Sequence, residues 1–280
     1  MVFVLCFYAT IVLRIILKID YMIILFAFIF GASLGSFANL VADRLRVKTI
    51  WTGRSECLTC SHKLSWKELF PIFSYIYQKG KCKFCKAKLS PTYLWSEVVS
   101  GLSICLLVYI LPTYTAIFYE QVVLFFTWSL ILVLSLIIII YDLRHTIVPM
   151  QISSILVIMG IVFTIYRQIY FGFNIYDSLS GVMISLPFAI MFFISKGKWV
   201  GFGDVLLYLA FGSILGLPLG VTTFFYSVWL GAFVSVVLML IHRKDFNLKT
   251  EIPFTPFIII ASLFAAYTNS DLLNLHEFMR

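Results

Sequence analysis

Long apolar stretches dominate this sequence and constrain its fold more than any other feature. They approach the roughly 20 residues that a helix needs to cross a bilayer. Of the 280 residues, 61% are hydrophobic and 12% are charged, whereas soluble domains average about 45–50% apolar and 25% charged residues. The sequence therefore predicts an all-α polytopic membrane protein with about eight transmembrane helices, at 22–41, 94–111, 121–141, 147–166, 178–195, 204–217, 219–241 and 254–269.

Polarity divides the chain into four parts. The predicted parts are an apolar N-terminal extension at 1–21, a first transmembrane helix at 22–41, a polar loop at 42–93 and a transmembrane core at 94–280. The extension lacks the small-residue cleavage site of a signal peptide. Within the core, 204–217 passes into 219–241 across only Leu217, Pro218 and Leu219, so this pair could also form a re-entrant hairpin.

The distribution of positive charge predicts the orientation in the membrane. Lys and Arg gather in cytoplasmic loops of membrane proteins, and the polar loop 42–93 is rich in both. With eight crossings, 17 of the 21 Lys and Arg fall on the cytoplasmic side, and the exceptions are Arg14, Lys18, Arg167 and Arg280. The net charge of +8 is thus explained by topology. We therefore expect the protein to interact with the lipid bilayer and not with nucleic acid.

Four cysteines in the polar loop form two Cys-x-x-Cys pairs, Cys57 with Cys60 and Cys82 with Cys85. Two such pairs can supply four thiolates to one tetrahedral zinc ion, and four protein ligands leave no open position for catalysis. We therefore expect a structural zinc site. His62 could replace one thiolate, and two disulfides or four free thiols are the alternatives, although the loop's cytoplasmic side favours reduced cysteines.

Two acidic residues lie where apolar helices meet the cytoplasmic side. Asp142 follows the apolar run that ends at Tyr141, and Asp204 follows Gly201-Phe-Gly203. A single interfacial aspartate is often only solvated or paired with a nearby cation. Two carboxyl groups held close together share one proton, so one acts as a base toward water and the other as an acid toward a carbonyl. The two glycines would let an extended substrate strand approach the carboxylate.

These motifs resemble those of the GxGD intramembrane aspartyl proteases. Tyr141-Asp142 and Gly-Phe-Gly-Asp at 201–204 look like their two catalytic signatures. Several further segments are similar to the prepilin peptidase branch, namely Gly-Ser-Phe-Ala-Asn within 31–45, the Cys-x-x-Cys loop with Phe-Pro-Ile-Phe-Ser-Tyr at 70–75, Glu97, and Ile-Pro-Phe-Thr-Pro-Phe at 252–257. The Pro-Ala-Leu stretch of the presenilin-like branch is absent near the C-terminus.

The resemblance implies a multi-pass enzyme of the bacterial cytoplasmic membrane. Such an enzyme cleaves the basic leader of type IV pilin-like precursors at the cytoplasmic face, with Asp142 and Asp204 as its catalytic pair. Many members then methylate the new N-terminus with S-adenosylmethionine. The resemblance thus implies pilin-like precursors as partners, with zinc and S-adenosylmethionine as cofactors.

Two positions depart from the family pattern. Met150 follows Pro149 where the family usually has Asp, and Leu206 stands where a Lys is common. Neither change touches the aspartates, but both bear on recognition and on methylation. A proton- or ion-coupled transporter is the alternative function, since transporters also use interfacial aspartates and helices interrupted by glycine. The cysteine loop, and the lack of a second Gly-Phe-Gly-Asp segment in the first half, favour the peptidase.

Overall fold

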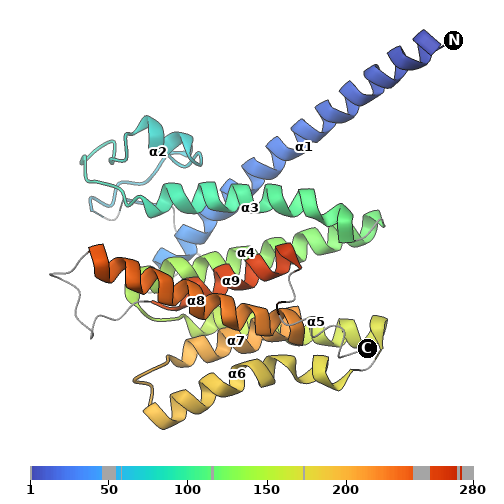
Figure 1. Ribbon diagram of the computed structural model, residues 1–280. Helices are drawn as coiled ribbons and strands as arrows, with labels where there is room; N and C mark the ends of the chain where they lie inside the picture. Colours follow the sequence, from blue (N-terminus) through green and yellow to red (C-terminus); the bar gives the residue numbers. More distant parts are fainter. Residues whose placement is uncertain are drawn as a thin grey trace. The chain divides into compact units, whose positions relative to one another are not determined.

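A computed structural model of the chain describes residues 2–45, 55–57, 59–114, 117–172, 174–241, 253–269 and 272 (Figure 1). The regular structure of the described residues is helical. Their only β pairings are two isolated bridges, Glu56 with Lys63 and Lys81 with Lys88. Met1–Leu136 and Ile137–Arg280 form two compact units, here called unit 1 and unit 2. The cations Arg46, Lys48, Arg54, Arg243, Lys244, Lys249 and Arg280, together with Ile252, lie outside the described residues.

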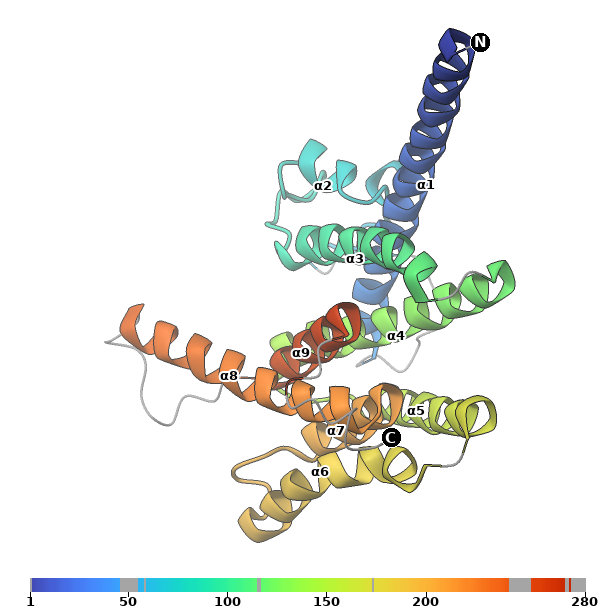
Figure 2. The same cartoon turned by 45° about the vertical axis from the view of Figure 1, so that its right-hand side comes forward.

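Unit 1 is built on two packed helices, α1 (Val2–Arg44) and α3 (Thr92–Tyr114) (Figure 2). Small residues allow their close contact, because a Cβ on Gly31 would lie 2.6 Å from the Ser100 carbonyl oxygen. Between the helices, the loop carries a short 3-10 helix (Trp66–Glu68) and α2 (Phe73–Tyr77). Helix α1 continues without a break through the predicted extension, and its membrane-competent part is Tyr21–Arg44.

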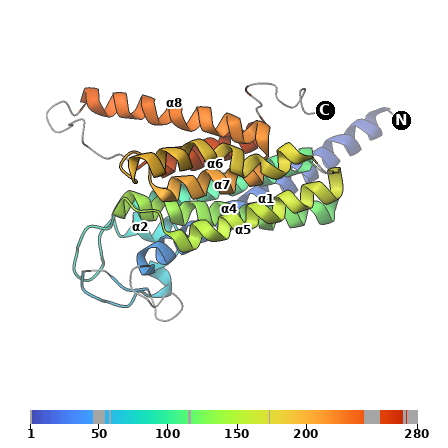
Figure 3. The ribbon, with the colours of Figure 1, turned by 90° about the horizontal axis from the view of Figure 1, so that it is seen from below.

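Unit 2 is a helical bundle centred on α7 (Phe202–Leu215). Helix α4 (Phe118–His145) enters it from unit 1, and α5 (Met150–Phe171), α6 (Ile175–Ser195), α8 (Leu217–Ile241) and α9 (Thr255–Thr268) complete it. Helix α7 contacts α5, α6, α8 and α9, and α5 and α6 run alongside it in Figure 3. Its side chains are correspondingly buried, with Leu207, Tyr208 and Ala210 at 0% exposure.

Helix lengths agree with the predicted membrane spans. Six helices in the described part of the chain are long and apolar enough to cross a membrane, whereas α7 and α9, with 14 residues each, are shorter. At 1.5 Å per residue, 14 residues reach only about 21 Å, less than the roughly 30 Å of hydrocarbon. The prediction of an all-α polytopic membrane protein is confirmed, and of the about eight predicted transmembrane helices six are long enough in the described part of the chain to span a membrane.

The predicted helices 204–217 and 219–241 meet at a different residue in the structure. The break falls at Gly216 and not at Leu217–Leu219, because Gly216 adopts φ +81° while Pro218 is accommodated in the first turn of α8. The two helices fold back on each other, since the Tyr208 and Ser227 hydroxyls hydrogen-bond at 2.6 Å.

Candidate active site and metal centre

Asp142 lies one turn before the end of α4 and is almost completely buried, at 4% exposure. Its Oδ2 atom is buried without a hydrogen-bond partner among the described residues. A carboxyl group in such surroundings is costly to bury unless another group compensates it or it serves chemistry.

Asp204 lies in the first turn of α7 and is 9% exposed. The helix N-terminus favours an acidic side chain there, and the Gly201 backbone amide hydrogen-bonds its carboxylate. The carboxyl groups of Asp142 and Asp204 are close enough for their charges to interact. Unit 2 therefore brings together the two aspartates that are 62 positions apart in the sequence.

Thr255 is the residue of this site that sequence reasoning missed. It is the first residue of α9 and is fully buried, at 0% exposure. Its hydroxyl donates to Asp204 Oδ1 over 3.4 Å and also hydrogen-bonds the Asp142 side chain. The available signal was Phe-Thr-Pro-Phe. Proline is common in the first turn of a helix, so Pro256 predicts a helix that begins beside Thr255.

The arrangement can perform acid–base chemistry on water. Three helices, α4, α7 and α9, each contribute one polar side chain to this site: Asp142, Asp204 and Thr255. Two carboxyl groups whose charges interact cannot both ionise easily, so such a pair can hold one proton between them. A hydroxyl that contacts both groups can fix their orientation, because it has one donor and two acceptor positions.

The two glycines before Asp204 differ in their surroundings. A Cβ on Gly203 would clash with the Val148 side chain, so this glycine is needed for packing against the segment after α4. A Cβ on Gly201 would lie 3.5 Å from Asp204 Oδ2, at an ordinary contact distance. A role in admitting a substrate stays a prediction for both residues. Gly201 suits this role better than Gly203, because Gly201 is exposed and lies beside the Asp204 carboxylate.

The four loop cysteines converge in unit 1. Their Sγ atoms all lie within 4.8 Å of one another, and all four residues are free thiols. The Sγ atoms of Cys57 and Cys85 are 3.8 Å apart, which matches the sulfur separation of about 3.8 Å that a tetrahedron with Zn–S bonds of about 2.3 Å requires. The donor set and its spacing therefore fit one tetrahedral metal ion.

The two Cys-x-x-Cys segments have the same backbone geometry. The Cys57 amide donates to the His62 carbonyl and the Ser61 amide to the Cys57 carbonyl, at 2.9 and 2.8 Å. The equivalent bonds of the second segment join Cys82 with Ala87 and Lys86 with Cys82, at 2.9 and 3.1 Å. Ser61 and Lys86 both adopt positive φ, 54° and 59°. Each segment is thus a complete metal-binding knuckle.

Electrostatics also prepare Cys57 to bind a metal. Backbone N–H groups of Thr59 and Cys60 donate to its sulfur and lower its pKa to about 6, against the opposing effect of burial. A lowered pKa favours the thiolate, the form that binds metals. His62 stacks on Phe84 with ring centroids 3.5 Å apart and is not part of the cluster, so the substitution of a thiolate by His62 finds no support.

Glu97 of α3 is a third buried acid, at 7% exposure, and it belongs to unit 1. Its Oε2 accepts the Ile72 amide over 2.7 Å, and its carboxyl also contacts Ser36 of α1. Ile72 has φ +63°, a conformation that is rare for a β-branched residue. Glu97 therefore joins both helices of unit 1 to a strained turn of the loop.

A bundle of apolar helices around paired carboxyl groups, with a separate cysteine knuckle, defines the class of polytopic membrane aspartyl peptidases. Two family models match the chain, together over more than half its length: the bacterial Peptidase A24 N-terminal domain at residues 29–111 and the Type IV leader peptidase family at residues 129–236. The chain belongs to this peptidase family. No solved structure gives a significant match.

Relatives from several bacteria are similar over nearly the whole chain, and each bears the name prepilin leader peptidase/N-methyltransferase. The protein of Bacillus subtilis (strain 168) is 29% identical over 251 residues, covering 89% of this chain and 96% of the relative. The protein of Aeromonas hydrophila is 24% identical, covering 85% and 88%, and that of Pseudomonas aeruginosa is 26% identical, covering 86% and 89%. These matches favour a multi-pass bacterial membrane peptidase and give no support to a transporter.

Proposed function

We propose that this chain is a membrane-embedded aspartyl endopeptidase that removes the leader peptide of type IV prepilin-like proteins. Its family and the names of its relatives support this class of substrate. The observation that carries the proposal is the meeting of Asp142 and Asp204, from α4 and α7, around the buried Thr255 hydroxyl.

In the proposed reaction the ionised carboxylate takes a proton from water while the protonated carboxyl donates to the scissile carbonyl oxygen. Water oxygen bonds to the carbonyl carbon and forms a tetrahedral intermediate. The first carboxyl then returns its proton to the leaving nitrogen, the C–N bond breaks, and the second recovers its proton from the collapsing hydroxyl. Thr255 keeps the two carboxyl groups oriented throughout.

The active site is proposed to face the cytoplasm. Asp142 precedes Arg144 and the connection to α5, and Asp204 follows Lys196 and Lys198, so both aspartates adjoin connections that carry the positive charge of cytoplasmic loops. A basic leader and an apolar helix on either side of the scissile bond would suit this position at the membrane surface.

Zinc and S-adenosylmethionine are the proposed cofactors. Zinc held by Cys57, Cys60, Cys82 and Cys85 would cross-link the polar loop and take no part in hydrolysis, because all four positions are occupied by protein. The names of the relatives support a second, methyl-transferring activity. Met150 and Leu206 depart from the family pattern, and no residue is assigned to that step.

The proposal is tested by co-expressing the chain with a candidate prepilin and determining the product's N-terminus by mass spectrometry. We expect a shortened product whose N-terminus is either free or methylated, so one spectrum reports both activities. Asp43→Asn is a matched control, because Asp43 accepts from Tyr93 within unit 1 and is not one of the two proposed catalytic acids. Intact leaders on several prepilins, with the enzyme well expressed, would refute the proposal.

A further inference from the structure

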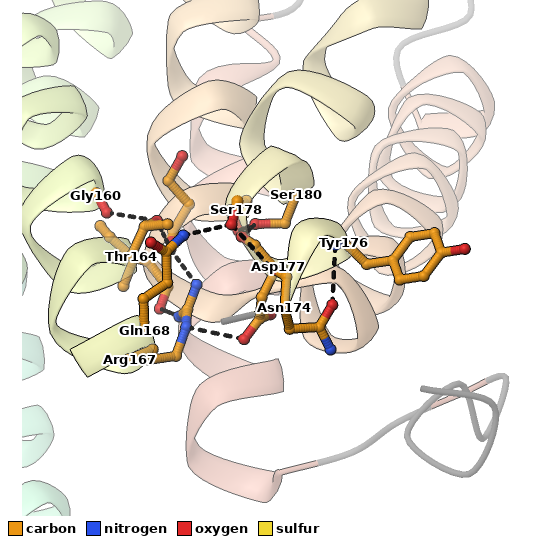
Figure 4. A network of polar contacts seen from close by, with 12 residues as sticks. Gly160, Thr164, Arg167, Gln168, Asn174, Tyr176, Asp177, Ser178 and Ser180 are labelled. Atoms are coloured by element: carbon orange, nitrogen blue, oxygen red, sulfur yellow. Dashed lines mark hydrogen bonds and ion pairs between the residues drawn. The ribbon is translucent and has the colours of Figure 1, made fainter. Parts of the chain in front are cut away.

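The C-terminal end of α7 is held by a polar network whose centre is Arg167 of α5 (Figure 4). The last carbonyl groups of any helix lack partners within the helix, and in a membrane protein such groups must be satisfied by other protein groups. Because α7 has only 14 residues, its end lies deep among neighbouring helices, with Gly212, Ile214 and Gly216 buried.

Side chains of two neighbouring helices satisfy these carbonyls. Arg167 donates from Nη1 to the Ile214 oxygen over 2.6 Å and from Nη2 to the Ser213 oxygen over 2.8 Å. Thr164 also donates to the Ser213 oxygen, over 3.2 Å. Ser180 of α6 donates to the Gly212 oxygen, over 2.9 Å, and this oxygen also accepts the Gly216 amide, over 3.0 Å. The guanidinium thus places a positive charge at the negative end of the α7 dipole.

Asp177 of α6 compensates the charge of Arg167. Its Oδ2 lies 3.4 Å from Arg167 Nε, and the two side chains are 28% and 19% exposed. The Nε–H has no well-aligned hydrogen bond, so Asp177 acts on it chiefly through charge. Gly216 completes the arrangement, because it has φ +81° and a Cβ there would lie 2.7 Å from Asp177 Oδ1.

Arg167 was one of the few cations that topology places on the non-cytoplasmic side. In the structure both terminal nitrogens of its guanidinium donate hydrogen bonds to α7. Asp204 lies at the opposite end of the same short helix. Any shift of α7 along its axis would therefore move the Asp204 carboxyl relative to Asp142 and Thr255.

We propose that Arg167, neutralised by Asp177, is a positioning residue that anchors the far end of α7 and so fixes the depth of Asp204 in the site. The proposal rests on the proposed function for its kinetic readout. The anchor is the pair of hydrogen bonds to the carbonyls, and the ion pair makes the half-buried charge of the guanidinium tolerable.

The variants separate these two roles. Arg167→Met removes the anchor and leaves Asp177 unpaired, which invites misfolding, so Arg167→Met/Asp177→Asn is made beside it to remove the anchor without leaving a charge. Arg167→Lys keeps the charge and a donor. Asp177→Asn keeps the anchor. Gln168→Met is the matched control, because the neighbouring Gln168 hydrogen-bonds Ser178 of α6 and makes no bond to α7.

Kinetics are measured on purified, folded protein with a prepilin substrate. We expect the double variant to lose about 10- to 100-fold in kcat with little change in KM, because a small misplacement of a reacting group costs up to about 100-fold. Arg167→Lys should be intermediate, and Asp177→Asn and Gln168→Met should stay within a few-fold of the parent. A double variant with the parent's kcat would overturn the proposal.

A second readout does not depend on cleavage. In a Gly201→Cys background, the rate of labelling by a water-soluble maleimide, measured by mass spectrometry on the peptide that carries residue 201, reports the position of the start of α7. We expect a several-fold change in this rate with the double variant and none with Gln168→Met. Unchanged labelling would refute the anchor. If the labelling changes as expected but the chain with its natural Gly201 cleaves no prepilin, only the proposed function is refuted.

Discussion

Units 1 and 2 both bury acidic groups, but they use them differently. In unit 1, Glu97 accepts a backbone amide from Ile72 and so supports a loop that has little apolar core. In unit 2, Asp142 and Asp204 face a shared hydroxyl from Thr255. The difference lies in the neighbouring acid: the Glu97 carboxyl holds a loop amide, which suits a structural role, whereas the two proposed catalytic acids interact with each other and can share a proton.

The two units also differ in what orders them. The loop of unit 1 has two knuckles and short helices whose residues are mostly exposed, so a metal at Cys57, Cys60, Cys82 and Cys85 would supply its main cross-link. Unit 2 is ordered by buried side chains around α7. Changes to the cysteines should therefore affect only unit 1, and changes near α7 only unit 2.

The largest expected effect is the loss of loop structure when a knuckle is broken. We predict one zinc per chain in protein purified without chelator, and loss of most of it in Cys57→Ser and in Cys82→Ser, because structural zinc contributes on the order of 10 kcal/mol in small zinc modules. Metal analysis and limited trypsin digestion measure this, with new cleavage at loop lysines such as Lys67 and Lys79. Cys105→Ser, in α3 outside the cluster, is the control.

A zinc-free parent with a protease-resistant loop would contradict that prediction. So would a Cys57–Cys60 disulfide in freshly alkylated cells.

A smaller effect is expected at Thr255. Thr255→Val keeps the shape of the side chain but removes the hydroxyl, and we predict a drop of about 10- to 100-fold in kcat, since a hydrogen bond to a charged group is worth about 1.5–3 kcal/mol. Thr255→Ser should retain most activity. Equal activity of the Val and Ser variants would show that the hydroxyl does not orient the pair.

Gly203 tests packing in the same region. Gly203→Ala places a methyl group against Val148, and we predict destabilisation of about 1–3 kcal/mol from overpacking. Val148→Gly, which also removes the Cβ atom that would lie 2.3 Å from the new methyl group, should restore stability in the double variant. Thermal unfolding in detergent measures both. If the second substitution gives no recovery, the glycine is required for another reason, such as the approach of substrate.

The smallest effect is predicted for the N-terminal extension. Deletion of 1–21 should leave cleavage unchanged, because the membrane-competent part of α1 begins at Tyr21 and the family match begins at residue 29. Activity per folded enzyme is compared with that of the full chain. A deletion variant that inserts into the membrane but does not cleave would mean that the extension is required for activity.

Much of this molecule could be predicted from its sequence. Helices were predictable because membrane spans follow from apolar length alone, and the cysteine cluster followed from its spacing. Thr255 was not, because a threonine beside a proline has no signal beyond the start of a helix. Arg167 was counted only as a charge on the non-cytoplasmic side, since its bonds to α7 depend on how three helices pack.

The proposed catalytic pair is tested most directly by comparing cleavage by Asp142→Asn, Asp204→Asn and the double variant on one verified prepilin. Asn keeps the shape of Asp but cannot exchange the shared proton, so each single variant should lose at least about 10²–10⁴ in rate. Because either change disables both the acid and the base, the double variant should be no slower than the singles. Near-parental cleavage by either single variant, at normal expression, would contradict the account.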